Sequence, residues 1–408
     1  MNRSDVLVVG AGIVGAAVAR AVRLAEPSLR VDVVEKEPAA ARHQTGRNSG
    51  VVHSGLYYKP GSLKATTCRE GRRRLIEFCG ERGVPLDLCG KVVVAVDGPE
   101  VERLDGLQAR AAENRVACRR VGAEELAELE PHCAGRSALH VSDTGIVDYV
   151  ATTNRMLEDV RGGGEVTFGS EVRGVRVAGG EVSVETSRGT RTTRLLVNCG
   201  GLQCDRIFRM AGGRPTVRIV PFRGEYYELS GSARHLCRNL IYPVPDPAFP
   251  FLGVHLTRMI DGSVECGPNA VLAFAREGYR FRDVRVRELV GTLAFSGFRK
   301  LAARHALMGL GEMRRSLSKR AFASAVRRLV PELRDDDLTA APSGVRAQAV
   351  RSDGGLVDDF LIEETERCVH VLNAPSPAAT ASLEIGRIVA ERALSVLRAA
   401  SGESATVA

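Results

Sequence analysis

The sequence predicts an α/β protein with two domains, in which insertions into the first domain build the second. Two observations at the N-terminus predict the first domain. An apolar run over residues 5–9 leads into a glycine motif over 10–15, and a second apolar run over 31–35 ends on a glutamate. The third observation is that glycine-rich turns return at 199–201 and 343–348, far along the chain. The first domain is therefore expected to be interrupted and resumed.

The glycine motif has the form of a dinucleotide-binding βαβ unit. Gly10 is expected to make the tight turn and Gly12 to let the backbone approach a pyrophosphate. Gly15 lets the helix expected over 13–25 pack closely on the sheet, with its N-terminus toward the phosphates. Glu35 ends the second strand, where a carboxylate binds the ribose hydroxyls of an adenosine.

Composition places the chain among ordinary globular proteins. It has 408 residues, of which 44% are hydrophobic and 26% charged, which favours two or three domains with a sizeable core. No apolar run approaches the roughly 20 residues that span a bilayer, and the N-terminus leads directly into the first strand, so we expect a cytoplasmic protein. The ten cysteines form no CxxC pair, so we expect buried thiols and no metal site.

The formal net charge of +8 comes mostly from arginine. Such an excess is typical of proteins that bind nucleic acid, an anionic membrane or an acidic substrate. Nucleic acid is the weakest of these, because the chain has no tryptophan, only 5% aromatic residues and no recognisable nucleic-acid module. Arginines spread over the surface would explain most of the excess without any partner.

Periodicity predicts the elements that follow. Helices are expected over 62–82, 99–115, 122–130, 149–161, several segments of the basic stretch 276–333, and from near Pro377 to 397. Strands are expected over 91–96, 138–142, 165–168, 172–178, 182–186, 194–198, 223–229, 251–258, 263–267 and 368–372. The nucleotide domain then comprises 1–90, 148–215 and 341–400, the second, substrate-binding α+β domain comprises 91–147 and 216–340, and 401–408 form a flexible tail.

This order favours FAD over NAD. A helix, a β-meander and a strand that closes on 199–201 are what a Rossmann-like domain adds when it holds FAD. A helix that began near Pro377 would present free N–H groups, since proline is tolerated in a first turn. At the pyrimidine edge of a flavin, that helix end would stabilise a negative charge by about 0.5–2 kcal/mol. An ordinary surface helix remains the alternative.

Longer motifs carry a family resemblance. They lie at His43–His53, Tyr57–Lys64, Pro221–Tyr226, Ile241–Pro247, Phe251–Gly262, Gly267–Ala270, Gly344–Gln348, Val357–Phe360 and Asn373–Thr380. Through them the chain resembles the L-2-hydroxyglutarate oxidases and dehydrogenases, which belong to the D-amino-acid-oxidase-like flavoproteins. The likeness is weakest over 278–340 and in the tail. It implies FAD as cofactor, oxidation of L-2-hydroxyglutarate to 2-oxoglutarate, and a quinone or oxygen as electron acceptor.

The motif and the resemblance together give a set of residues expected to contact the cofactor. They are Gly10, Gly12, Ile13, Val14, Gly15, Glu35, Lys36, Thr45, Asn48, Ser49, Gly50, Val172, Gly200, Asn373, Ser376, Pro377, Ala378 and Ala379. His43 is a further candidate for contact with the flavin, or for covalent attachment to it.

A dicarboxylate substrate needs cationic groups at both ends, and arginine can bind a carboxylate through two parallel hydrogen bonds. Arg346 is the first candidate, because its loop resembles the family loop beside the flavin; one such contact is worth about 1.5–3 kcal/mol. Gln348 is expected to assist it. Arg223 and Arg258 are candidates for the distal carboxylate, with structural ion pairing as the alternative for each.

Oxidation of a hydroxyl also needs a base, and histidine is half neutral near its usual pKa of about 6.5. His53 follows the nucleotide motif, and His255 lies on an expected strand. Side chains alternate along a strand, so His255 and Arg258 should not both point into one pocket. Either histidine is the predicted base, with a structural role as the alternative.

Two other functions remain open at this stage. One is an FAD enzyme of the same fold that acts on an amine, an amino acid or glycerol 3-phosphate. The other is a module that holds FAD without catalysis. The basic helical stretch also suggests peripheral contact with the inner face of a membrane, with a solvated face as the alternative.

Overall fold

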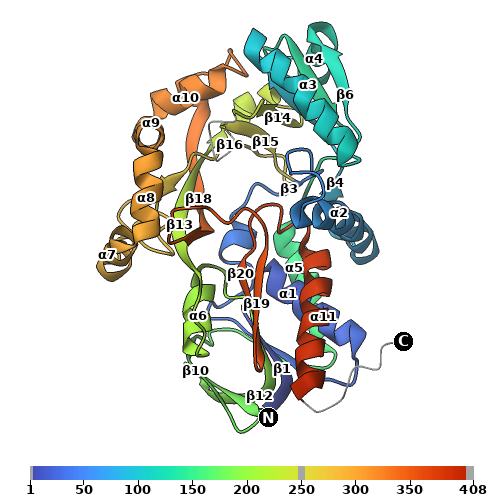
Figure 1. The fold of residues 1–408 in the computed structure, drawn as a ribbon. Helices are drawn as coiled ribbons and strands as arrows, with labels where there is room; N and C mark the ends of the chain where they lie inside the picture. The colour runs from blue at the N-terminus through green and yellow to red at the C-terminus, as the bar shows by residue number, and fades with distance from the viewer. Residues whose placement is uncertain (1–2, 247–252, 401–408) are drawn as a thin grey trace.

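The computed structural model describes residues 3–246 and 253–400. Two large sheets with surrounding helices form the lower and upper halves of the view in Figure 1, which confirms the α/β class. The long strands β13 (Val217–Leu229) and β18 (Leu338–Arg351) belong to the upper sheet and reach toward the lower half. The tail 401–408 and residues 251–252 of an expected strand lie outside the described residues.

The lower sheet carries the glycine motif. Its strands are β1 (Arg3–Val9), β2 (Val31–Val34), β9 (Val166–Thr167), β10 (Val172–Ala178), β11 (Glu181–Thr186), β12 (Gly189–Asn198), β19 (Leu361–Thr365) and β20 (Cys368–Asn373). The order is β10-β11-β12-β1-β2-β9, with β20 beside β12 and β19 beside β20. β1 is parallel to both β2 and β12, so their carboxyl ends meet at one edge, where ligands bind in open α/β sheets.

Five helices pack around the lower sheet or beside it. They are α1 (Ile13–Ala25), α2 (Leu63–Arg82), α5 (Tyr149–Arg161), α6 (Cys204–Met210) and α11 (Ser382–Ala400). Local sequence fixes several ends: Ser62 caps α2 by accepting from the Ala65 amide at 3.2 Å, and Asp148 caps α5 by accepting from the Ala151 amide at 2.8 Å. Gly83 ends α2 in the left-handed conformation.

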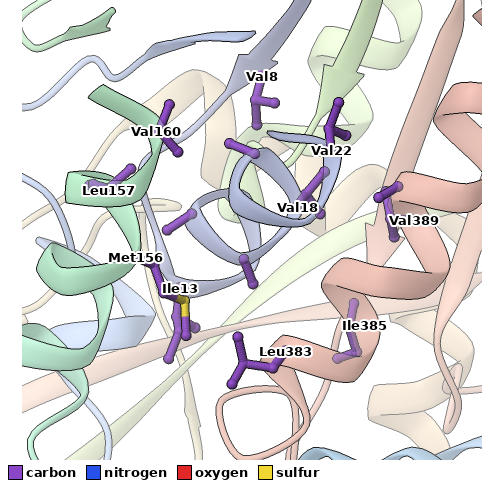
Figure 2. Close-up of a cluster of buried hydrophobic side chains, with 14 of the residues drawn as sticks. Val8, Ile13, Val18, Val22, Met156, Leu157, Val160, Leu383, Ile385 and Val389 are labelled. Carbon is purple, nitrogen blue, oxygen red and sulfur yellow. The ribbon is translucent and has the colours of Figure 1, made fainter. Parts of the chain in front are cut away.

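Helix α1 lies at the centre of the lower core. Figure 2 shows Ile13, Val18 and Val22 of α1 between side chains of α5 and of α11. The side chains that face α1 are Met156, Leu157 and Val160 from α5, and Leu383, Ile385 and Val389 from α11. Burying one such side chain contributes about 1.5–3 kcal/mol, so this packing holds the start of α1, and with it the glycine motif, in place.

The upper sheet has the order β17-β13-β16-β15-β14-β5-β7-β6, with β18 beside β13. Its remaining strands are β5 (Lys91–Ala95), β6 (Arg119–Gly122), β7 (Ser137–Val141), β14 (Leu240–Pro243), β15 (His255–Arg258), β16 (Val264–Gly267) and β17 (Val271–Leu272). A small third sheet joins β3 (Val51–Val52), β8 (Gly145–Val147) and β4 (Leu86–Asp87).

The remaining helices belong to the upper half of Figure 1. They are α3 (Gly98–Glu113), α4 (Ala123–Leu129), α7 (Val286–Ala294), α8 (Ser296–Arg304), α9 (Ala306–Leu317) and α10 (Lys319–Arg327); 3₁₀ turns lie at Gln44–Gly46, Gly201–Gln203, Gly231–Leu236 and Asp335–Asp337. No helix of the described residues is both long enough and apolar enough to cross a membrane.

Two expectations about the C-terminal third were wrong. Residues 344–348 were assigned to the nucleotide domain, but they lie within β18, which pairs with β13 of the upper sheet from Leu338 to Arg351. The chain returns to the lower sheet at β19. The last helix does not begin near Pro377 but at Ser382. Residues 376–381 form turns instead, in which the Ala378 and Ala381 amides donate to the Pro375 and Pro377 carbonyls.

Candidate active site

A cavity of about 860 Å³ runs from the glycine motif to the upper sheet. This is near the upper end of the 300–1,000 Å³ typical of ligand pockets, as expected for a dinucleotide together with a small substrate. Of the residues predicted to bind the cofactor, all except Gly50 line it. His53, His255, Arg346 and Gln348 also line it, whereas Arg223 and Arg258 do not.

The dinucleotide end of the cavity is made by backbone that leaves no room for side chains. Gly10 has φ +103°, and a Cβ there would lie 2.6 Å from the Cys199 carbonyl oxygen. A Cβ on Gly15 would lie 2.0 Å from the Gly10 carbonyl oxygen. Gly12 brings no capping side chain to α1, and Thr45 Oγ1 accepts from the Ile13 amide, so the next N–H groups of the first turn remain for a ligand in the cavity. This arrangement fits a pyrophosphate.

Glu35 is held where a ribose would bind. The Ala11 amide donates to its Oε2 at 2.8 Å, and the Glu37 amide donates to its Oε1 at 2.9 Å. The carboxylate is therefore fixed beside the glycine turn and lines the cavity. Val172, at the start of β10, lines the same end, and Gly200 lines it where β12 has ended.

The loop over 42–53 is braced from three directions. Thr45 Oγ1 accepts from the Ile13 amide at 3.0 Å, and Gln44 Oε1 accepts from the Ala347 amide of β18 at 3.0 Å. The Asn48 amide group donates to the Thr45 carbonyl at 2.8 Å and accepts from the Gly50 amide at 2.8 Å. Asn48 and Gly50 therefore shape the loop, and Gly50 does so without lining the cavity.

The segment after β20 carries a second braced loop. The Asn373 amide group donates to the carbonyl oxygens of Val357 at 2.9 Å and of Asp359 at 2.8 Å, which ties it to the β18–β19 connection. Ser376 Oγ lies 3.4 Å from His53 Nε2. Because the Ala378 amide is already bonded within a turn, the helix end predicted at Pro377 is replaced by a turn, and residues 376–379 of this turn line the cavity.

His255 is a neutral histidine with a defined tautomer. Its Nδ1 lies 3.0 Å from the Gly253 carbonyl oxygen, so Nδ1 carries the proton and Nε2 keeps a lone pair. Burial lowers the pKa of His255 to about 4, and the positive charges of Arg346 and Lys91 add to this effect. Its ring stacks on Tyr242 at 4.0 Å between centroids. Neutrality and a free Nε2 are what a general base requires.

His53 is also neutral. Burial lowers its pKa to about 3, with contributions from Lys91 and from His255. Its backbone amide donates to Thr380 Oγ1 at 3.0 Å, which fixes the end of the braced loop. The cavity therefore has two neutral histidines near the positive charges of Lys91 and Arg346. Neither histidine has a carboxylate among its described hydrogen-bond partners.

The four polar candidates other than the histidines have different positions. Arg346 lies on β18, lines the cavity and acts electrostatically on His255 and Tyr226. Gln348 lines the cavity, but its amide nitrogen donates to the Ala349 carbonyl at 3.1 Å and the Val357 carbonyl at 3.3 Å. Arg223 bonds Glu225 at 3.0 Å, and Arg258 of the upper sheet bonds Asp87 of β4 in the small third sheet, so both make structural ion pairs.

Lys64 is a cavity-lining cation that was not among the residues predicted from the sequence. It lies on α2, 5.4 Å from the Tyr58 ring centroid, and burial lowers its pKa. Tyr58 in turn bonds Ser376, which neighbours His53. Lys64 ends one of the resemblance motifs, but its spacing gave no sign that the first turn of a helix would face the cavity.

Glu37, His43 and Glu277 are close enough together to hold a metal ion. The Lys36 ammonium already donates to Glu37, lies 3.0 Å from Glu277 and lies 2.9 Å from His43 Nε2. His43 Nδ1 bonds the Tyr279 hydroxyl, so both of its ring nitrogens are engaged within the protein. This cluster joins the end of β2 to the upper half of the molecule, and it leaves His43 no free nitrogen for a flavin.

All ten cysteines are free; six are buried and four are half-buried. The prediction of buried thiols therefore holds for six of the ten.

Comparison with known proteins defines the class. The family described as FAD dependent oxidoreductase (DAO) matches residues 5–392. The chain belongs to this family, and its cofactor is FAD.

Curated relatives narrow the class. The chain is 48% identical over 393 residues to the L-2-hydroxyglutarate dehydrogenase of Indibacter alkaliphilus, covering 96% of this chain and 98% of the relative. It is 44% identical over 405 residues to the enzyme of the same name from Escherichia coli K12, covering 99% of this chain and 96% of the relative.

Solved structures share the fold. The L-alpha-glycerophosphate oxidase of Mycoplasma pneumoniae, solved with FAD bound, has a TM-score of 0.78 at 21% identity, with 98% of this chain and 95% of that chain covered. The glycine oxidase of Geobacillus kaustophilus has a TM-score of 0.71 at 18% identity, covering 96% and 95%. At these identities the likeness shows the fold alone.

Proposed function

We propose that this FAD-dependent oxidoreductase oxidises L-2-hydroxyglutarate to 2-oxoglutarate. The observation that carries the proposal is the convergence of two neutral histidines and Arg346 at one end of the FAD cavity. A base and a carboxylate-binding cation are what a 2-hydroxy acid requires. The two relatives described above, which are 48% and 44% identical to this chain and are both named L-2-hydroxyglutarate dehydrogenase, support this substrate.

The chain's own residues supply binding and a base. Arg346 binds the carboxylate beside the reacting carbon, through two parallel hydrogen bonds. Bound FAD supplies the acceptor for the hydride that leaves this carbon. His255 Nε2 takes the hydroxyl proton, because the Gly253 carbonyl holds the other ring nitrogen protonated. His53 is the second candidate for this role, and Lys64 replaces Arg223 and Arg258 as the candidate for the distal carboxylate.

Product formation with an artificial electron acceptor tests the substrate. L-2-hydroxyglutarate should give 2-oxoglutarate, and its D enantiomer should give at least tenfold less. Sarcosine and glycerol 3-phosphate test the same-fold alternatives. Turnover of either one, with none of L-2-hydroxyglutarate, would overturn the proposal, and flavin that none of these compounds reduces would favour a module that binds FAD without catalysis.

A membrane quinone is the proposed electron acceptor, reached from the face formed by α7, α8 and α9. Eight of the thirteen large hydrophobic side chains exposed among the described residues lie between 281 and 317. Leu307 and Leu310 are 88% and 67% exposed and share one face of α9. Arg304 and Arg314 flank them. An apolar face bordered by arginines is suited to the inner, anionic surface of a membrane.

Vesicles that contain phosphatidylglycerol test this contact. The protein should sediment with them at low salt and less at high salt. The double variant Leu307→Asp/Leu310→Asp should stay in the supernatant, whereas Leu24→Asp, which alters a 60% exposed leucine on α1, should sediment like the unaltered protein. Equal sedimentation of the unaltered protein and of both variants would contradict membrane contact through α9. Rapid turnover with oxygen alone would contradict a quinone as the electron acceptor.

A further inference from the structure

Lys91, the first residue of β5, is a cation buried without a carboxylate. The residue is only 2% exposed, and its ammonium lies 4.4 Å from the Tyr57 ring centroid and 5.1 Å from that of Tyr242. No ion pair joins it to any carboxylate of the described residues. Burying an ammonium is costly, and lysines are rarely buried unless they are paired. Two aromatic faces offset only part of that cost, so Lys91 is a candidate for a functional role.

The position of Lys91 connects it to the cavity. Tyr57 and Tyr242, whose rings it contacts, both line the cavity, although Lys91 itself does not. The titratable groups that face Lys91 come from the β3–α2 connection, from α2, from the segment before β6, and from the neighbouring strands. They are Tyr57, His53, Cys68, Cys118, Tyr242 and His255. Arg346 faces the same histidine from β18.

We propose that Lys91 is a positioning residue for this reaction: from behind the two tyrosines, its ammonium attracts a dicarboxylate to the end of the cavity where His53 and His255 lie. The identity of the dicarboxylate rests on the proposed function. The electrostatic role rests on the geometry of Lys91, and it holds for any small dianion that enters this end of the cavity.

The charge of Lys91 is expected to change within the neutral range. Burial lowers the pKa of Lys91 to about 7. The ammonium is therefore present below pH 7 and is lost as the pH rises above it. The pKa values of His53 and His255 lie at about 3 and 4, and burial raises those of the two cysteines and two tyrosines. Between pH 6 and 9, Lys91 is thus the group of this set that titrates.

Glu265 is the competing group. It lies on β16, burial raises its pKa to about 7, and it acts on Tyr226. Because its carboxylate also appears as the pH rises through 7, it would weaken anion binding in the same direction. The substitution Glu265→Gln separates the two groups, since it removes this charge and leaves Lys91 unchanged.

Binding of glutarate to the holoenzyme, followed by the flavin absorbance from pH 6 to 9, tests the proposal without turnover. Glutarate stays ionised over this range, so its affinity should fall about fivefold or more as the pH passes 7. Lys91→Met should bind weakly at every pH. Lys91→Arg should bind tightly at every pH, because a guanidinium stays charged. Glu265→Gln should keep the transition of the unaltered enzyme.

Stability separates this role from a structural one. Lys91→Met replaces a buried charge by an apolar chain of similar length, so its melting temperature should be unchanged or higher. The acid limb of kcat/KM should move to higher pH in this variant, because the histidines lose a neighbouring cation. Lys300→Met, the same substitution at an exposed site on α8, should leave both profiles unchanged.

Two results would overturn the proposal. One is glutarate binding by the unaltered holoenzyme that does not change between pH 6 and 9, and this result decides the question even where a variant fails to fold. The other is a Lys91→Met variant that keeps the transition. Failure of L-2-hydroxyglutarate to reduce the flavin, with the glutarate transition intact, would instead contradict the proposed substrate and leave the role of Lys91 in place.

Discussion

The two ends of the cavity are built in different ways. The dinucleotide end consists largely of backbone from residues 10–15 and of Glu35, both from the first 35 residues of the chain, with Val172 and Gly200 added from later segments. The other end consists of side chains from separate segments, namely His53, His255 and Arg346. Close approach of backbone requires glycine, which a sequence shows directly. A set of side chains depends on how distant strands pair, and local sequence does not show this.

The strongest test of the dinucleotide end is Gly15→Ala. A single methyl group there would lie 2.0 Å from the Gly10 carbonyl oxygen, so we expect almost complete loss of bound flavin and of soluble protein. Gly80→Ala is the matched control, because a Cβ there meets nothing within 4 Å. The ratio of flavin to protein absorbance measures the effect. Full flavin content in Gly15→Ala would show that close packing of the backbone at Gly15 is not needed to bind FAD.

The next largest effect is expected on kcat, when the general base at the substrate end of the cavity is removed. His255→Asn should lower kcat by about 10²- to 10⁴-fold, the usual contribution of a general base, with the flavin spectrum retained. His53→Asn should have the smaller effect on kcat. Pre-steady-state flavin reduction measures both variants, and the reverse ranking would make His53 the base.

Arg346→Ala should raise KM by about 10- to 150-fold, because a charged hydrogen-bonded contact is worth about 1.5–3 kcal/mol. Flavin content should stay normal. Arg258→Gln is the control, because Arg258 pairs with Asp87 outside the cavity; its KM should change less than twofold. If Arg346→Ala loses flavin instead, Arg346 binds the cofactor and not the substrate.

The smallest predicted effect is a loss of folding stability as the pH falls. The pKa values of His53, His255 and His370 are lowered by burial to about 3, 4 and 4. Unfolded histidines take up protons near pH 6.5, and these folded ones do not. Their stabilisation is therefore present above pH 6.5 and is lost as the pH falls toward 4, by about 1 kcal/mol per histidine for each pH unit.

Denaturant unfolding at pH 6.5 and 5.5 measures this loss. His370 is fully buried in β20, in the lower half of the molecule, so His370→Met should reduce the loss by about 1 kcal/mol for each pH unit. An unchanged slope in that variant would assign the dependence to the cavity histidines alone.

The sequence predicted the local elements well. Helix α1 begins and ends at the expected residues 13 and 25, and α5 at 149 and 161. These elements are set by caps and by periodicity within a few residues. The glycine motif was equally clear, because a side chain at Gly10 or Gly15 would clash with neighbouring backbone.

The errors came from long-range pairing. Residues 344–348 were placed in the wrong sheet because nothing local shows that β18 pairs with β13, more than 100 residues earlier. Arg223 was a reasonable candidate, but its neighbour Glu225 faces the same way and pairs with it. Lys91 looked like an ordinary start of a β-branched strand, and only the packing of Tyr57 and Tyr242 over it shows its burial.

Anaerobic mixing of the purified holoenzyme with L-2-hydroxyglutarate tests the central claim most directly. We predict loss of the flavin absorbance near 450 nm, with one 2-oxoglutarate formed for each flavin reduced. A flavin that stays oxidised with this acid, but is reduced by sarcosine or glycerol 3-phosphate, would contradict it.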